Sequence, residues 1–261
     1  KEDFEPGGGV ESTKTRTFLK IQDGCNSFCT YCVIPFARGK SRSLSIESIV
    51  QRVNELHDSG FNEVVLTGVH IGDYEFGLPN LVRGVLEETK ISRIRLSSLE
   101  PLELSEDLLD LFQNDRLCPH FHMSIQSAET SVLKGMKRQY TAQDVEMALN
   151  WIAKKVPNAF VGMDVIVGFP GEGEDEFYET YKRLDSLPWS RIHVFPYSER
   201  PGTYALRLDQ KVPFHEIQLR AERLRTLSSE RYKTQAQKQL GLVKKVMWLK
   251  AKSPQALSKD Y

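Results

Sequence analysis

The sequence GCNSFCTYCVIPFARGKSRS, residues 24–43, holds Cys25, Cys29 and Cys32 in the spacing C-x3-C-x2-C, and the chain has four cysteines in all. Three thiols this close cannot all pair as disulfides, whereas soft thiolates at short spacing suit zinc or an iron–sulfur cluster. A structural zinc site usually takes four protein ligands, often as two C-x2-C pairs, and the sequence has no second pair. Three ligands for a four-iron cluster leave one iron open to a substrate. A zinc knuckle, or a surface loop with incidental cysteines, is the alternative.

The composition around this loop is that of an ordinary globular protein. The 261 residues fit one large α/β barrel or two small domains, with 40 % hydrophobic and 27 % charged residues. The formal net charge is zero, so any basic surface for a nucleic acid must be local. The sequence has no apolar run that could span a bilayer and no signal peptide. Together with the clustered thiols, this predicts a protein of the reducing cytoplasm with no membrane partner.

Short apolar segments alternate with amphipathic helical segments along most of the chain. This order predicts parallel βα units joined by right-handed crossovers. Strands are expected at 18–21, 63–67, 93–99, 120–126, 159–167 and 191–197. Helices are expected at 45–59, 78–90, 105–112, 141–155, 174–187 and 213–240.

Small, polar and glycine residues follow each of these expected strands. The cysteine loop follows the first strand, Thr67-Gly68-Val69-His70 the second, and Gly168-Phe169-Pro170-Gly171-Glu172 the fifth. In barrels of parallel strands the chemistry lies at the carboxyl ends, where glycine lets a ligand approach the backbone closely. Each segment alone is explained as a turn, but their repetition on one rim indicates a ligand site.

Several of these stretches resemble a known family. The cysteine loop CNSFCTYCVIPFARGKSRS, with LTGVHIGDY, RIRLSSLEP, VLKGMKRQYT, DVIVGFPGE and HVFPYSERPGTYA, resembles the methylthiotransferase branch of the radical S-adenosylmethionine (SAM) enzymes. The resemblance spans roughly residues 15–240. It implies an α/β fold, the open, partial (β/α)6 TIM-like barrel of that superfamily.

The resemblance also implies roles for individual residues. Cys25, Cys29 and Cys32 would hold a [4Fe-4S] cluster whose open iron takes SAM. The positions that would contact SAM are Tyr31, Thr67, Gly68, Ser98, Glu100, Arg138, Ile166 and Gly168. For Glu100 and Arg138 a salt bridge at the barrel rim is an alternative. Two places depart from the family: Ala128-Glu129 where it often has glycine, and Gln139 where it usually has proline.

The resemblance divides the chain into three parts. Residues 1–14 are expected to be a linker, 15–241 the radical SAM core domain, and 242–261 the truncated start of a small β domain of the TRAM type. Methylthiotransferases carry a second [4Fe-4S] cluster in an N-terminal domain, which this sequence does not contain. We therefore expect the chain to bind one cluster and SAM without completing sulfur insertion alone.

The cysteine loop and the second strand end favour one substrate. They resemble the branch that methylthiolates C2 of N6-threonylcarbamoyladenosine at position 37 of tRNA. The alternatives are the branches acting on N6-isopentenyladenosine or on a ribosomal-protein aspartate. Arg38, Lys40 and Arg42 could donate to a polar modification or contact tRNA phosphate. The expected partners are tRNA and an electron donor of the flavodoxin or ferredoxin type.

Two other function classes stay open: a different radical SAM enzyme, and a non-catalytic cluster-binding RNA scaffold that uses the basic residues of the last helix. The fourth cysteine, Cys118, is expected to be a small buried hydrophobe and not a ligand. His120, His122 and His193 are expected to be barrel residues, which leaves His70 as the histidine at the rim.

Overall fold

Six parallel strands form the frame of the molecule. The computed structural model describes residues 16–249 and 255–260, so the expected linker at 1–14 lies outside the described residues. The strands are β1 (Thr17–Lys20), β4 (Glu63–Thr67), β5 (Arg93–Leu96), β6 (His120–Gln126), β7 (Phe160–Val167) and β8 (Arg191–Pro196).

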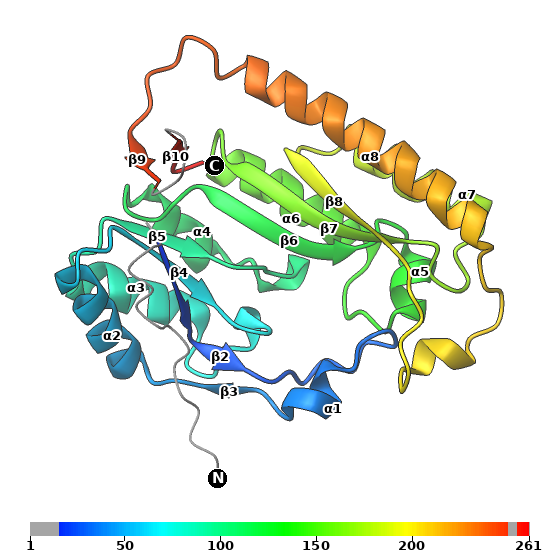
Figure 1. The fold of residues 1–261 in the computed structure, drawn as a ribbon, viewed down its shortest axis with the longest axis horizontal. Helices are drawn as coiled ribbons and strands as arrows, with labels where there is room; N and C mark the ends of the chain where they lie inside the picture. Colours follow the sequence, from blue (N-terminus) through cyan, green and yellow to red (C-terminus); the bar gives the residue numbers. More distant parts are fainter. Residues whose placement is uncertain (1–15, 250–254, 261) are drawn as a thin grey trace.

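The strands follow one another across the sheet in chain order. Parallel pairing gives two ladders, β1-β4-β5 and β6-β7-β8. Single parallel bridges, Ile94 to Leu117 and Leu99 to Met123, join the two ladders. Figure 1 shows β4 and β5 at one side of the sheet and β6, β7 and β8 next to one another at the other. This arrangement confirms the predicted partial (β/α)6 barrel.

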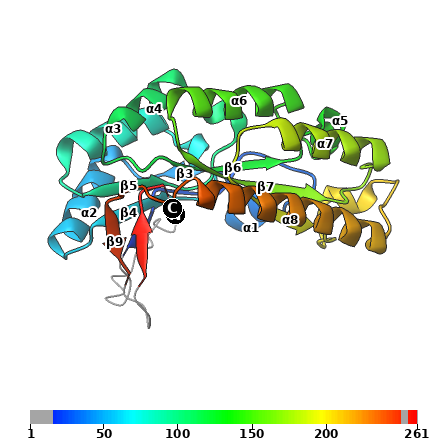
Figure 2. The same cartoon turned by 90° about the horizontal axis from the view of Figure 1, so that it is seen from above.

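Helices cover the outer face of this curved sheet, as Figure 2 shows for α3, α4 and α6. The helices are α1 (Ile34–Arg38), α2 (Ile46–Asp58), α3 (Leu78–Glu88), α4 (Glu106–Asp110), α5 (Thr130–Gly135), α6 (Ala142–Lys155), α7 (Glu174–Ser186) and α8 (Phe214–Gln237). In α2, Ile49, Val50, Val53 and Leu56 are buried, and the side chain of Ser45 accepts a hydrogen bond from Ser48 N. The apolar periodicity and the N-cap therefore explain the start and the buried face of this helix.

Some elements are shorter than the sequence predicts. The strand expected at 93–99 ends at Leu96. Ser97 N still donates to the Leu66 carbonyl of β4, and the next pairing is the single bridge from Leu99 to Met123 of β6. The helix expected at 105–112 becomes 3-10 after Asp110. The helix expected to reach residue 240 ends at Gln237, before the positive-φ Gly241.

The chain end forms a small antiparallel hairpin of β9 (Val246–Trp248) and β10 (Ala256–Ser258). The Arg93 guanidinium donates hydrogen bonds to the carbonyl oxygens of Lys245 (2.9 Å) and Leu257 (2.8 Å), which attaches the hairpin to the sheet. That residues 242–261 begin a TRAM-like domain stays a prediction.

The cysteine loop is closed by its own small hairpin. Strand β2 (Gln22–Asp23) pairs antiparallel with β3 (Arg42–Ser43) on either side of the loop. At Gly24 the φ angle is 77°, and a Cβ there would lie 2.1 Å from the Lys40 carbonyl oxygen. Only glycine fits this close backbone crossing. No helix among the described residues is long and apolar enough to cross a membrane.

Candidate functional site

The three clustered cysteines are free thiols, and each sulfur faces a nitrogen donor. The Cys25 Sγ accepts from Ser27 N at 3.3 Å and the Cys32 Sγ from Ile34 N at 3.4 Å. The Cys29 Sγ accepts from the Arg138 guanidinium at 3.0 Å. Donors of this kind stabilise thiolates and the negative charge of a cluster. The donor set therefore fits an iron–sulfur cluster held by Cys25, Cys29 and Cys32.

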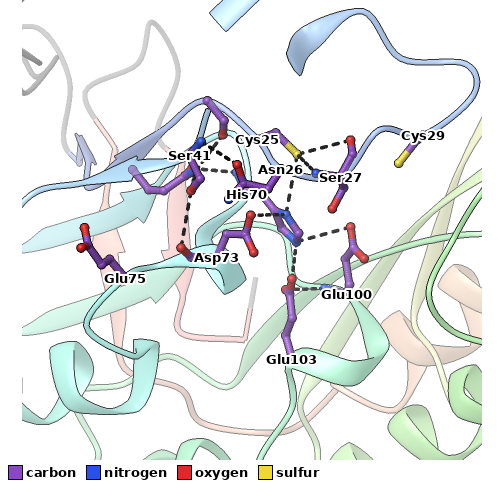
Figure 3. A network of polar contacts seen from close by, with 12 residues as sticks. Cys25, Asn26, Ser27, Cys29, Ser41, His70, Asp73, Glu75, Glu100 and Glu103 are labelled. Carbon is purple, nitrogen blue, oxygen red and sulfur yellow. Dashed lines mark hydrogen bonds and ion pairs between the residues drawn. The ribbon is translucent and has the colours of Figure 1, made fainter. Parts of the chain in front are cut away.

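His70 links Cys25 to a group of carboxylates at the ends of neighbouring strands (Figure 3). Its Nδ1 lies 3.8 Å from the Cys25 Sγ, and its Nε2 contacts Glu103 and lies 3.4 Å from the Glu100 carboxylate. Burial lowers the pKa of His70, but Cys25, Glu103 and Glu100 outweigh it and raise the pKa to about 11. Burial raises the pKa of the Cys25 thiol, yet the contacts with His70 and Ser27 bring it below its usual value. The network thus favours a thiolate at Cys25.

Arg138 joins the cluster loop to the other side of the rim. Its guanidinium lies 2.5 Å from the Glu100 carboxylate and 2.9 Å from the Tyr140 hydroxyl, with its side chain 5 % exposed. Burial raises the pKa of Glu100 more than Arg138 and His70 lower it. The salt bridge considered for Glu100 and Arg138 is therefore present. The same guanidinium also donates to the Cys29 sulfur. SAM binding by Glu100 and Arg138 stays a prediction.

Thr67 ends β4, and Gly68 follows it beside the start of the cysteine loop. A Cβ on Gly68 would lie 2.8 Å from the Gln22 Oε1, which itself accepts from the His70 backbone N–H at 2.8 Å. The glycine is therefore needed for the strand end to approach β2. Ser98 lies elsewhere, in the lining of a cavity of about 260 Å³ inside the barrel. The structure thus places Gly68 against Gln22, a hydrogen-bond partner of His70, and Ser98 in the cavity lining.

Tyr31 and Ile166 share one apolar cluster around Phe169, where the rings of Tyr31 and Phe169 meet edge to face with centroids 6.4 Å apart. Gly168 has a φ of 77°, and its N–H donates to the buried Glu172 carboxylate at 2.8 Å. The strand end and the cysteine loop therefore contribute to one apolar wall. Such a wall suits a flat aromatic ring such as adenine.

The basic residues of the loop lie on its outer side. Arg42 lies 3.2 Å and Arg38 3.9 Å from the Asp23 carboxylate, and Lys40 is exposed. Cys118 lies apart from the loop: it is 1 % exposed, its N–H donates to the Ile94 carbonyl, and burial raises its pKa to about 11. Cys118 is therefore a buried residue beside β5, as the sequence predicts.

The partners of His70 were not identified from the sequence. Glu103 also accepts from the Glu100 backbone N–H, at 2.7 Å, and so closes the turn after β5. The only sequence signal was the Glu100-Pro101-Leu102-Glu103 spacing, which is typical of a capped 3-10 turn. Its approach to His70 depends on the neighbouring position of β4 and β5.

Curated relatives match most of this chain but only part of their own length. The threonylcarbamoyladenosine tRNA methylthiotransferase MtaB of Aquifex aeolicus (strain VF5) is 44 % identical over 217 residues, 81 % of this chain and 52 % of that protein. The protein of the same name from Bacillus subtilis (strain 168) is 40 % identical, covering 83 % of this chain and 50 % of that protein. A tRNA-2-methylthio-N(6)-dimethylallyladenosine synthase from Clostridium tetani (strain Massachusetts / E88) is 36 % identical over 77 % of this chain and 46 % of that protein. The chain thus spans about half the length of the curated relatives it matches.

Solved structures share the fold at low sequence identity. The radical S-adenosylmethionine methyltransferase TsrM from Kitasatospora setae superposes with a TM-score of 0.64 at 18 % identity, over 72 % of this chain and 38 % of that one. Coproporphyrinogen III oxidase (HemN) from Escherichia coli gives 0.57 at 18 % identity, over 84 % of this chain and 52 % of that one. The sequence profile of the Radical SAM superfamily matches residues 19–184, which include all three cysteines of the loop. The chain belongs to the Radical SAM superfamily.

Proposed function

We propose that this chain is the radical SAM core of a methylthiotransferase that modifies C2 of N6-threonylcarbamoyladenosine at position 37 of tRNA. The observation that carries the proposal is the loop of Cys25, Cys29 and Cys32, in which every sulfur faces a nitrogen donor. Relatives named for this reaction match the chain at 40 % and 44 % identity. Because the chain spans about half the length of these relatives, the activity of the whole protein is part of the proposal.

A protein with the whole activity would need further parts. We expect a second [4Fe-4S] cluster in an N-terminal domain, an electron donor of the flavodoxin or ferredoxin type, and a cytoplasmic location where tRNA is available. The linker at 1–14 and the TRAM-like start at 242–261 would connect the core to its neighbours. These expectations follow from the resemblance stated above.

When bound, a reduced [4Fe-4S] cluster supplies the electron that cleaves SAM into methionine and a 5′-deoxyadenosyl radical. Cys25, Cys29 and Cys32 would hold the cluster, and Ser27, Ile34 and Arg138 donate hydrogen bonds to their sulfurs. Arg138 would orient the SAM carboxylate, while the wall of Tyr31, Ile166 and Gly168 would accept the adenine. Cys29 is buried and Cys25 and Cys32 are half-buried, which limits the access of water to their sulfurs.

The isopentenyl substrate is the second candidate, because a relative named for the dimethylallyl compound matches at 36 % identity. The sequence favours the threonylcarbamoyl substrate: Ala37 precedes Arg38-Gly39, and Val69-His70 follows Gly68. A carboxylate-bearing substituent needs cationic donors in its pocket, whereas an isopentenyl group needs an apolar wall.

Mass spectrometry of tRNA nucleosides tests this choice. A strain that lacks the full-length gene should lose 2-methylthio-N6-threonylcarbamoyladenosine and keep its unmethylthiolated precursor. The gene restored on a plasmid should return the product. Loss of the isopentenyl methylthio product, with the threonylcarbamoyl product intact, would overturn the proposal.

A further inference from the structure

A groove of about 510 Å³ lies against the cysteine loop. Its walls come from that loop with α1, from the turn that follows α5, and from the 3-10 turn η4 (Tyr204–Arg207). Thr30 joins these three segments. Its N–H donates to the Met136 carbonyl at 3.1 Å, its hydroxyl donates to the Gly135 carbonyl at 2.9 Å, and its carbonyl accepts from the Ala205 N–H at 2.8 Å. The walls of the groove are therefore held at fixed positions by the contacts of one residue.

Three aromatic side chains of the groove are exposed. Phe36 is 74 % exposed, Tyr204 58 % and Phe28 50 %. The rings of Phe28 and Phe36 meet edge to face with centroids 5.7 Å apart, so they form one apolar surface on the loop. Exposed rings lose the stabilisation that burial gives, and contiguous apolar groups rimmed by polar residues mark a binding site. The aromatic pair therefore favours a ligand with a flat apolar face.

The charged residues of the groove are cations. Lys137 and Arg207 line it and are exposed, and none of its described lining residues is an Asp or a Glu. Neither cation has an ion-pair partner in residues 16–249 or 255–260. The groove therefore attracts an anionic ligand. Single-stranded nucleic acid combines both chemistries, because its bases stack on aromatic rings while Lys and Arg contact its phosphates.

The groove also reaches the candidate site. Cys29 and Cys32, two of the three expected cluster ligands, are part of its lining. Its volume lies within the range of small-ligand pockets, about 300–1,000 Å³, whereas a protein partner buries a broad surface even in weak redox complexes. The concave shape and the aromatic pair therefore favour a nucleotide over an electron-donor protein as the occupant.

We propose that this groove binds an unpaired nucleotide of the substrate RNA, with its base on Phe36 and its phosphate at Lys137 and Arg207. Phe28 supports the Phe36 ring through their edge-to-face contact. The proposal rests on the proposed function and names the surface that would hold a nucleotide beside the modified adenosine. Because every base can stack on an aromatic ring, the groove should hold the RNA without selecting its sequence.

The first test measures how the full-length, anaerobically reconstituted protein binds a fluorescein-labelled anticodon stem-loop RNA that carries N6-threonylcarbamoyladenosine. Phe36→Ala should raise Kd about tenfold, because the stacking of one base on an aromatic ring is lost. Phe36→Tyr keeps the ring and should restore most of the affinity. Phe214→Ala removes a 75 % exposed phenylalanine of α8, outside the groove, and should match the parent.

The salt dependence of the same binding tests the two cations. Lys137→Gln and Arg207→Gln should each flatten the slope of log Kd against log salt concentration by about 0.7, the value for one phosphate contact with a single strand. A merely structural loss would weaken binding without this change of slope. Lys90→Gln removes an exposed cation that follows α3, and it should keep the slope of the parent.

Three outcomes would contradict the RNA groove. One is an unchanged Kd in Phe36→Ala. Another is an equal loss of affinity for an RNA duplex that has no unpaired nucleotide. The third is unchanged RNA binding by the variants with slower reduction by flavodoxin, which would make the groove a docking surface for a redox protein. If the parent binds the RNA but forms no methylthio product on it, the proposed function fails while the groove stands, which is a separate result.

Discussion

At the scale of single residues, Arg138 joins three side chains of the candidate site. It donates to the Cys29 sulfur at 3.0 Å, pairs with Glu100 at 2.5 Å, and bonds to the Tyr140 hydroxyl at 2.9 Å. The sequence offered two interpretations, a rim salt bridge or a contact with the SAM carboxylate. The structure contains the salt bridge, and contact with the SAM carboxylate stays a prediction.

Replacement of Arg138 separates these roles. In Arg138→Lys the positive charge opposite Glu100 is kept, but the forked donor geometry is lost. We expect SAM affinity to fall about tenfold, or about 1.4 kcal/mol, with the iron content of the reconstituted protein unchanged. Equilibrium dialysis measures the SAM affinity, and a colorimetric iron assay measures the iron content. Equal affinity in Arg138→Lys and the parent would contradict the role of Arg138, with Arg83→Lys as the control.

His120 predicts how stability depends on pH. Burial, with nearby Arg95, lowers the pKa of His120 to about 3, and its ring stacks on Phe160 with centroids 5.5 Å apart. The folded state therefore binds fewer protons than the unfolded state, whose histidine pKa is about 6.5. The stability that this neutral histidine supplies is present above pH 6.5 and is lost as the pH falls toward 3. Between pH 6.5 and 5 the loss is at most about 2 kcal/mol.

Urea denaturation of the parent and His120→Gln at pH 8.0 and pH 5.0 checks this dependence. The difference between the parent's two midpoints should exceed the difference for His120→Gln, because glutamine does not titrate. If the urea midpoints of the two proteins changed equally with pH, protonation of His120 would not destabilise the folded state, and the prediction would be wrong.

At the scale of elements, the sequence predicted most strands and helices because their apolar periods are regular. His120–Gln126 was predicted without error, and Ser45 and Thr141 cap helices as expected. Element ends were less predictable where tertiary contacts decide them. The strand from Arg93 stops at Leu96, since Leu99 meets Met123 of β6 by a single bridge that no local pattern encodes.

The turn after β7 can be tested by a matched pair of glycine substitutions. Gly168 and Gly60 both have positive φ, 77° and 89°. A Cβ on Gly168 would lie 2.4 Å from Ile217 of α8, whereas a Cβ on Gly60 would have nothing within 4 Å. Gly60→Ala should cost about 1–2 kcal/mol from backbone strain alone. Gly168→Ala should cost about 1–3 kcal/mol more from overpacking.

Thermal denaturation of the two variants measures this difference. The midpoint of Gly168→Ala should fall further than that of Gly60→Ala. Equal decreases in the thermal midpoint of the two variants would contradict this prediction. They would show that Ile217 of α8 can move away from the added methyl group at no cost in stability.

At the scale of the whole molecule, the candidate cluster ligands could be proposed from sequence, whereas the charged barrel interior could not be predicted. Cys25, Cys29 and Cys32 lie within eight consecutive residues, so local spacing was sufficient. Glu63 lies on β4 whereas Arg93 and Arg95 lie on β5, and only the register of β4 with β5 brings Glu63 beside Arg93. Arg93 and Arg95 alternate in a strand that is otherwise apolar, and this was the one local signal of a charged interior.

The central claim is that the loop of three cysteines holds the cluster that cleaves SAM. The most direct measurement is 5′-deoxyadenosine formed after dithionite is added to the anaerobically reconstituted chain with SAM. The parent and Cys118→Ala should each bind about four irons and form the product. Cys25→Ala, Cys29→Ala and Cys32→Ala should each lose the cluster and the product. Product formation by any of these three variants, or its loss in Cys118→Ala alone, would contradict the account.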